Sequence, residues 1–223
     1  MAGLKLISVN VGLPREVLSN GKVVTTGIFK EPVEGRVWVR TLNLEGDRQA
    51  DLTVHGGKHK AVYGYPAEHY EFWRTQFPDM NLGWGMFGEN LTLSGLLEHE
   101  VHVGDRLRVG SALLMVTQPR LPCYKLGIKF GRADMVKRFL ESRRTGFYFS
   151  VLEEGEAAAG DVIEFVSKSQ DSVTVADVTS LYARRKNGNR QLLKRALLTE
   201  SLPERWRDYF WKQLQQLDTA GRK

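Results

Sequence analysis

The stretch VTQPRLPCYKL, residues 116–126, contains the only cysteine of this 223-residue chain, Cys123. Pro119 and Pro122 each fix their own φ and favour an extended conformation in the preceding residue, so we expect Cys123 on a stiff, irregular segment after a strand. Arg120 and Lys125 lie close in sequence, and positive charge favours the thiolate, which attacks electrophiles and binds metals. A solitary cysteine is more often a small buried hydrophobic residue, so the pattern alone leaves that alternative open.

Length and composition favour a protein that folds around its own core. The 223 residues suffice for one domain of ordinary size, with or without a small appendage. A single cysteine cannot form an intramolecular disulfide, and the N-terminal residues lack the pattern of a secretory leader. The longest fully apolar run, residues 112–116, is far too short to cross a membrane. We therefore expect a soluble protein of the reducing cytoplasm.

Positive charge is concentrated towards the C-terminus. The formal net charge is +6, and residues 182–223 hold 11 Lys and Arg against 4 Asp and Glu, which leaves 21 against 22 in the rest. A basic tail can attract anions, nucleic acid or an acidic protein, although a solvated helical face is the commoner explanation.

The first 170 residues predict a β-rich structure. Short alternating or β-branched runs predict strands at residues 4–11, 22–29, 36–42, 89–93, 147–152 and 161–166, and a hairpin at 101–116. Helices are expected near residues 66–77 and 133–141. Many short strands, few helices and no alternation of strand and helix favour a closed or strongly coiled β-structure.

The hydrophobic period changes after about residue 172. Residues 174–184, 190–198 and 203–217 predict three amphipathic helices. In the last of them, Trp206, Phe210 and Leu214 recur at helical spacing. We expect a small helical appendage in this part of the chain.

Several familiar catalytic patterns are missing from the sequence. The five histidines form no zinc motif, and neither a Walker-type phosphate loop nor a G-x-S-x-G motif is present. Residues 83–88, GWGMFG, match the dinucleotide fingerprint only formally, because a polar loop precedes them and a strand is expected after them. What remains is the thiol with its cations and a glycine-bearing loop with His55, Lys58, His59 and Lys60. Together they suggest a phosphate-bearing ligand that carries a soft metal, unless the loop is an ordinary solvated turn.

Four blocks of the sequence resemble the MOSC domain family, which is named for the C-terminal domain of molybdenum-cofactor sulfurases. They are VHGG with KAVY at 54–57 and 60–63, FGENL at 87–91, GD at 104–105, and QPRLPCYKL at 118–126. The helical tail makes the chain most similar to the YiiM-like group of that family. The resemblance implies a mainly β fold: a β-barrel domain at 31–168 with a few peripheral helices, joined by the N-terminal strands of residues 1–30. The change of hydrophobic period places the three-helix appendage at 173–218, outside the motifs of the family.

The resemblance also implies a function and a set of site residues. It implies a molybdenum–pterin cofactor with Cys123 as the protein ligand of molybdenum, and reduction of N-hydroxylated compounds such as 6-N-hydroxylaminopurine and related base analogues. We predict that His55 carries a proton. The predicted cofactor-binding residues are Gly56, Gly57, Lys60, Gly88, Asn90, Gln118, Arg120 and Lys125. The cations would hold the phosphate or pterin, the amides would bind ring edges, and the glycines would set the backbone geometry.

Each of these assignments has a structural alternative. Asn90 could cap a turn, Gln118 could bind backbone at a strand end, and His55 could bind a nearby carbonyl. Glu89 is a weaker candidate, because a carboxylate would repel an anionic cofactor.

The reduction needs two electrons from outside the chain, since the sequence contains no flavin fingerprint and no cysteine set for an iron–sulfur cluster. We expect a separate flavoprotein or flavodoxin-like donor, which the basic tail could dock, a small-molecule N-hydroxylated substrate and no membrane partner; a homodimer is a further expectation.

Two alternatives stay open. Cys123 could serve a carrier of molybdenum cofactor or of persulfide sulfur, and the tail could bind nucleic acid, a weaker alternative because the body shows no basic groove with interleaved aromatic residues.

Overall fold

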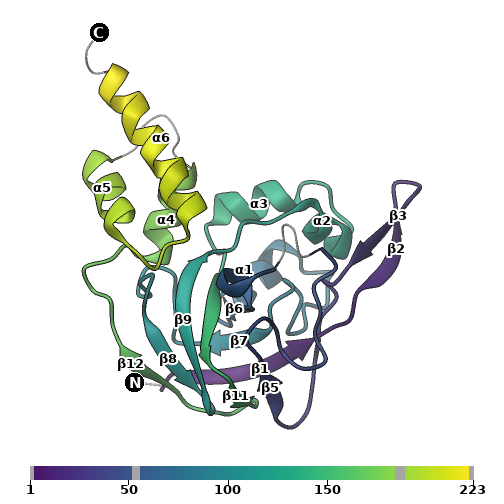
Figure 1. The fold of residues 1–223 in the computed structure, drawn as a ribbon. Coiled ribbons are helices and arrows are strands. Elements are labelled where there is room, and N and C mark those ends of the chain that lie inside the picture. The colour runs from purple at the N-terminus through teal and green to yellow at the C-terminus, as the bar shows by residue number, and fades with distance from the viewer. Residues whose placement is uncertain (1–2, 52–55, 184–188, 221–223) are drawn as a thin grey trace.

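An eight-stranded sheet forms the centre of the protein in the computed structural model, which describes residues 3–51, 56–183 and 189–220 (Figure 1). Its strands in spatial order are β12 (Ile163–Ser167), β8 (Arg106–Val109), β9 (Ala112–Pro119), β10 (Phe147–Glu153), β6 (Val62–Pro66), β7 (Leu91–Ser94), β1 (Lys5–Val11) and β4 (Glu31–Pro32). Neighbouring strands are antiparallel except β6 and β7, which are parallel.

The sheet is not a closed barrel. Within the described ranges, no continuous ladder joins the edge strand β12 to β1; an isolated bridge between Lys5 and Val162 brings them together, and Ile163 N–H donates to the Leu4 carbonyl at 3.0 Å. Helices and strands occupy about 29% and 30% of the described residues. The predicted mainly β barrel was therefore wrong in these two respects: the sheet remains open, and the architecture is mixed α/β, because α2 and the three C-terminal helices add to the helices between strands.

Two small sheets flank the large one. Strands β2 (Arg15–Ser19) and β3 (Lys22–Thr26) form an arm that extends from the body (Figure 1). Its turn consists of Asn20 and Gly21, with φ of 50° and 74°, as in a two-residue hairpin turn that suits the twist of the strands. Strand β5 (Val37–Val39) pairs with β11 (Gly155–Ala157).

Four helical segments surround the sheet and bring an aromatic core with them. They are the short 3₁₀ helix η1 (Lys58–Lys60), α1 (His69–Gln76), α2 (Tyr124–Phe130) and α3 (Met135–Ser142). Tyr65, Trp73, Phe87 and Phe139 are fully or almost fully buried and pack in stacked or tilted pairs. Helix α2 was not predicted, because only seven residues separate Cys123 from Gly131, whose left-handed backbone ends the helix.

Three C-terminal helices, α4 (Val175–Ala183), α5 (Arg190–Leu198) and α6 (Glu204–Ala220), confirm the predicted helical unit. They gather at one end of the molecule, away from the β2–β3 arm (Figure 1). Their core contains Leu193, Trp206 and Phe210, and it also includes Val103 from the loop before β8. The helical unit therefore shares buried surface with the sheet region. No helix among the described residues is long and apolar enough to cross a membrane.

Asn189 caps α5, and we expect its loss to weaken the helical unit. Its side-chain oxygen accepts from the N–H groups of Gln191 at 3.0 Å and Leu192 at 3.2 Å. Replacing Asn189 with alanine should lower the free energy of unfolding by about 1 kcal/mol, because both donors then lose their partner within the protein. Urea unfolding measures the change. Asn189→Asp keeps the acceptor and should unfold at nearly the native urea concentration, so an equal loss in both variants would contradict the cap.

Candidate functional site

A cavity lies where η1, β6 and the start of α2 meet the segment that follows the β2–β3 arm. It contains about 660 Å³ of space, part of it open to solvent. The structure brings six of the predicted site residues to its wall: Lys60, Gly88, Asn90, Arg120, Cys123 and Lys125.

Cys123 lies between the end of β9 and the first residue of α2. Its backbone is extended, with φ of −120° and ψ of 172°, and it lies in the short irregular segment expected after the strand. The side chain is partly exposed and lines the cavity, so Cys123 is not a buried hydrophobic residue of the core. In the described part of the chain, no group of three or more His, Cys, Asp or Glu could hold a metal ion. Among these described residues, Cys123 therefore offers a metal one thiolate and not a complete set of ligands.

Arg120 places a buried positive charge at the same cavity. The residue is only 6% exposed, and its Nη1 has no hydrogen-bond partner among the described residues. Its guanidinium lies over the rings of Tyr63 at 5.0 Å and Phe139 at 5.2 Å. Burial lowers the pKa of Arg120, but the neighbouring Tyr63, Tyr148 and Cys123 raise it, and the net shift is upward. A buried cation with an unused N–H group is a good binding site for an anion.

The remaining charges on the cavity wall have the same sign. Of the described residues that line it, five are Lys or Arg and none is Asp or Glu; the five are Lys30, Arg48, Lys60, Arg120 and Lys125. Lys30 forms a buried ion pair with Asp47, which lies behind the wall. Burial lowers the pKa of Lys60 to about 8, with a smaller contribution from the charge of Arg205. The arrangement favours an anionic ligand.

Asn90 and Gly88 form part of the wall, and the Asn90 side chain is already bound within the protein. The Asn90 amide nitrogen donates to Asp47 Oδ2 at 2.9 Å, and its oxygen accepts from the Tyr63 N–H at 3.1 Å. The structure thus gives Asn90 a role in holding the wall, while its predicted contact with a ring edge stays a prediction. Gly88 has a φ of 79°, and a Cβ there would lie 2.8 Å from Ile28 Cγ1, so only glycine fits without a shift.

Glu89 organises the glycine-rich turn at 83–88. Its fully buried carboxylate accepts from the N–H groups of Gly85 at 2.8 Å and Phe87 at 3.0 Å, and from the Tyr70 hydroxyl. Burial raises the pKa of this carboxyl group. The residues that formally match a dinucleotide fingerprint therefore wrap around a carboxylate of the same chain.

The other predicted residues lie elsewhere. Gln118 is not on the cavity wall; its amide binds the His59 carbonyl and side chains of α6. Gly57 precedes η1 with a φ of 87°, and Gly56 comes directly before it. His55 lies outside the described residues, so its proton-carrying role stays a prediction.

Sequence reasoning missed several residues of the wall. Tyr63 and Tyr148 lie with ring centroids 5.3 Å apart, and the Tyr63 hydroxyl donates to the Thr145 carbonyl at 2.8 Å. Tyr63 belongs to the KAVY block, which offered a signal that we did not use. Lys30 and Arg48 lie outside all four blocks, and no signal in one sequence joins them to Cys123.

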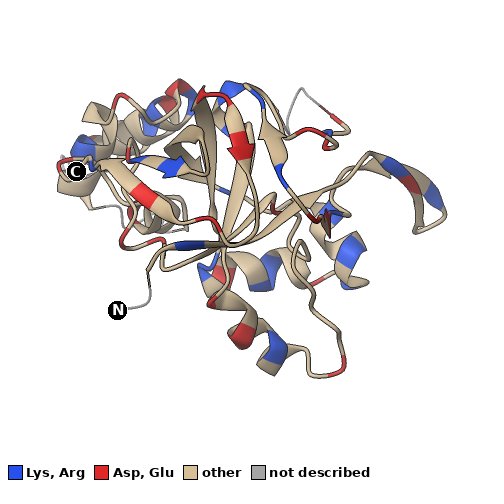
Figure 2. Ribbon diagram, turned by 90° about the horizontal axis from the view of Figure 1, so that it is seen from below, with Lys and Arg blue, Asp and Glu red and all other residues tan. Residues whose placement is uncertain are grey.

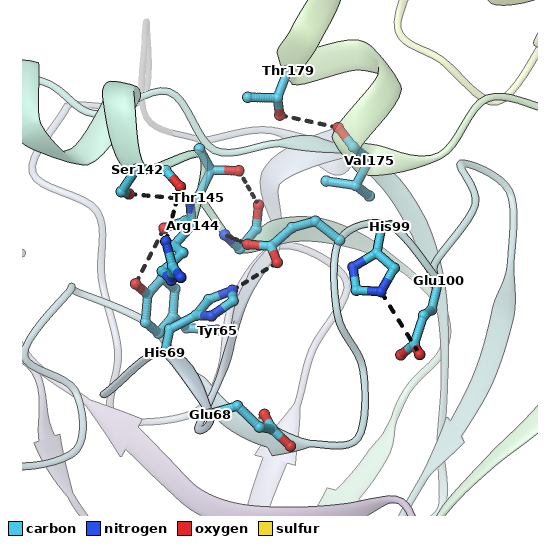
Figure 3. A network of polar contacts seen from close by, with 12 residues as sticks. Tyr65, Glu68, His69, His99, Glu100, Ser142, Arg144, Thr145, Val175 and Thr179 are labelled. Atoms are coloured by element: carbon cyan, nitrogen blue, oxygen red, sulfur yellow. Dashed lines mark hydrogen bonds and ion pairs between the residues drawn. The ribbon is translucent and has the colours of Figure 1, made fainter. Parts of the chain in front are cut away.

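A second hollow lies near α1 and the loop at 142–146, and Figure 3 shows its polar network. His69 Nε2 lies 2.7 Å from Glu98 Oε2, while the other Glu98 oxygen accepts from the Gly146 N–H at 2.8 Å. The Tyr65 hydroxyl donates to the Arg144 carbonyl at 3.1 Å. These buried groups bind one another and the hollow contains no thiol, so the Cys123 cavity is the better candidate.

Comparison with known proteins identifies the family. The family described as "MOSC domain" matches residues 51–164, which include the Lys60 turn and Cys123. The chain belongs to the MOSC family. A second family, "YiiM-like, 3-alpha helix domain", matches residues 173–217 of this MOSC protein, which contain α4, α5 and most of α6.

Three known proteins place this MOSC protein among its relatives. It is 42% identical to an uncharacterized protein, YflK, of Bacillus subtilis over 95% of both chains. A protein of Gibberella moniliformis named "Reductase" is 31% identical over 78% of this chain and 31% of its own length. The crystal structure of YiiM from Geobacillus stearothermophilus superposes with a TM-score of 0.78 and 32% identity, and the match covers 95% of this chain and 99% of that one.

Proposed function

We propose that this MOSC protein is a molybdenum-cofactor-dependent reductase of N-hydroxylated compounds, such as 6-N-hydroxylaminopurine and related base analogues. One observation carries the proposal: the partly exposed Cys123 thiol shares a cavity with five cations and no carboxylate among its described wall residues. The family and the relative named "Reductase" support it.

The residues of the cavity fit a molybdenum–pterin cofactor. Such a group carries a phosphate, and the Nη1 of the buried Arg120, which has no partner among the residues that the structure describes, is suited to an anion. Lys60 and Lys125 add positive charge on the same wall, and the Cys123 thiolate is the soft ligand that molybdenum would need from the protein. Cys123 would hold the metal, and the three cations would hold the phosphate or pterin. When bound, the cofactor supplies the two-electron chemistry.

The overall reaction consumes two protons and two electrons for each N–O bond that breaks, and it releases an amine and water. The residues of the chain bind and orient the reacting groups and supply protons. With its pKa lowered to about 8, Lys60 is still mostly charged at neutral pH and can hold a phosphate at the cavity wall. Burial keeps the pKa of Tyr63 well above its usual value, so its hydroxyl stays neutral and holds the Thr145 carbonyl. We propose that a separate flavoprotein or flavodoxin-like protein delivers the electrons.

The two alternative functions differ in measurable ways. A carrier would use the same thiol but would show a cofactor or sulfur adduct without turnover of N-hydroxylated bases. For nucleic-acid binding, part of the basic tail lies outside the described residues, and charges of both signs alternate along the described helices and the arm (Figure 2). No specific observation favours either alternative over the reductase.

Metal analysis combined with a reduction assay tests the proposal. The purified chain should contain molybdenum and should convert 6-N-hydroxylaminopurine to adenine with a chemically reduced dye as electron donor. Molybdenum without turnover would favour the carrier. A chain that contains no molybdenum after expression in a cofactor-producing host would contradict the reductase and the cofactor carrier, and a sulfur adduct on Cys123 would then favour the persulfide carrier.

Anion binding should depend on pH through Lys60. The ammonium form binds anions; because its pKa is lowered to about 8, the charge is present below that pH and lost above it. The affinity of the apo-protein for inorganic phosphate should fall between pH 7 and pH 9.5. The fall should be about threefold to tenfold larger in the native chain than in Lys60→Arg, because the arginine stays charged. Isothermal titration calorimetry measures both affinities. Equal pH dependence of the two would contradict a role for Lys60.

A further inference from the structure

The N-terminal end of α6 reaches the sheet next to the cavity. Arg205 Nη2 and Trp206 Nε1 both donate to the Gln118 side-chain oxygen, each at 2.8 Å. Arg205 and Trp206 belong to the three-helix unit, whereas Gln118 lies near the end of β9, five residues before Cys123. Two donors from the helical unit thus fix a side chain of the strand that leads to the thiol.

Gln118, which is fixed by these two donors, also binds the turn that contains Lys60. Its amide nitrogen donates to the His59 carbonyl at 2.9 Å, and Thr117 Oγ1 donates to the same oxygen at 2.8 Å. Within the turn, the Lys60 N–H donates to the Gly57 carbonyl at 2.9 Å. The carbonyl next to Lys60 therefore accepts two hydrogen bonds from β9, one of which depends on a side chain held by α6.

Arg205 also acts on the turn through its charge. Burial is the larger cause of the lowered pKa of Lys60, and the positive charge of Arg205 is the second cause. The same charge contributes to the lowered pKa of His59. Arg205 itself is exposed at the junction and does not line the cavity. Its influence on a bound anion would thus be exerted through Gln118 and Lys60.

We propose that Arg205 is a positioning residue of the cavity, through which the three-helix unit holds the Lys58–Lys60 turn and Lys60 in place for a phosphate-bearing ligand. The helical unit is then a structural part of the site. The inference rests on the proposed function in one respect, namely that the phosphate-bearing ligand is the cofactor. The hydrogen bonds from which the role of Arg205 is inferred all lie within the protein. Simple packing between the two units would give the same contacts without an effect on Lys60.

The test uses the full-length chain and three variants. Arg205→Met removes both the hydrogen bond and the charge, Trp206→Phe removes one donor and keeps an aromatic ring, and Arg190→Met is the control. Arg190 belongs to the same unit but binds Asp218 and the Leu217 carbonyl. Two measurements need no cofactor: the pH midpoint at which Lys60 reacts with traces of acetic anhydride, read by mass spectrometry, and amide hydrogen exchange in residues 57–60. Molybdenum content is measured in parallel.

Arg205→Met should raise the Lys60 midpoint by about half a pH unit and speed exchange at the Lys60 amide about fivefold. Trp206→Phe should speed exchange and leave the midpoint unchanged, and Arg190→Met should change neither. An Arg205→Met protein with the native midpoint and exchange rate, or an Arg190→Met protein with the same changes as Arg205→Met, would overturn the proposal. If these results hold while the native chain contains no molybdenum, the proposed function fails and the positioning role of Arg205 stands.

Discussion

Replacing Cys123 with serine is expected to remove molybdenum from the purified protein and to reduce turnover of 6-N-hydroxylaminopurine to background. Cys123 is the only cysteine, so no other thiolate can take its place. A serine hydroxyl is a much poorer ligand for a soft metal, and loss of a ligand or its support commonly costs tenfold or more in metal affinity. We expect at least a tenfold loss of bound molybdenum, measured by plasma mass spectrometry, and a larger loss of activity.

The fold should tolerate this change, because the Cys123 side chain is partly exposed and makes no capping hydrogen bond to α2. Thermal unfolding of the apo-protein should therefore hardly differ from the native chain. Tyr124→Phe is a matched control, since the next residue is 60% exposed and does not line the cavity. If Cys123→Ser keeps the molybdenum content and the activity of the native chain, the thiol takes no part in the mechanism.

Replacing Arg120 with methionine should weaken ligand binding and leave the apo-protein at least as stable as the native chain. The native guanidinium is buried, and its Nη1 has no partner in the described part of the chain, so without a ligand the protein bears the cost of desolvating a charge. Methionine fills similar space, and the apo-protein should be as stable as the native chain or more stable by about 1 kcal/mol. Binding of the phosphate-bearing cofactor should weaken about tenfold to a hundredfold, since charge-assisted hydrogen bonds are lost.

Unfolding of the apo-protein in urea and the molybdenum content of the expressed protein measure the two effects. Arg144→Met is the control, because Arg144 lies over the ring of Phe72, 3.9 Å from its centroid, beside the second hollow rather than on the cavity wall. An Arg120→Met protein that is strongly destabilised but binds cofactor normally would mean that Arg120 serves the core and not the ligand.

The parts of the site that could be predicted are those that lie close together in sequence. Arg120, Cys123 and Lys125 reach one cavity because two prolines hold a short segment extended before α2. The C-terminal helices could also be predicted from the sequence, because their apolar residues recur with a helical period over a long run. In both cases local backbone preferences agree with the tertiary structure.

The rest depends on contacts between distant residues. Lys30 and Arg48 reach the cavity only through the path of the loops around the arm, which no local pattern specifies. Gln118 was expected on the wall, but it is bound by Arg205 and Trp206, which are almost ninety residues away in sequence. The openness of the sheet was also not predictable, since alternation of apolar residues sets which face is buried and not whether the last strand meets the first.

The central position of β6 in the sheet has a consequence for folding during synthesis. β6 pairs with β7 on one side and with β10 on the other, and β10 begins at Phe147, more than eighty residues later. Tyr148 of β10 also completes the cavity wall. A nascent chain thus has no complete pocket until β10 has left the ribosome, and contacts of such long range form slowly. Any prosthetic group must therefore be loaded after most of the polypeptide has been translated.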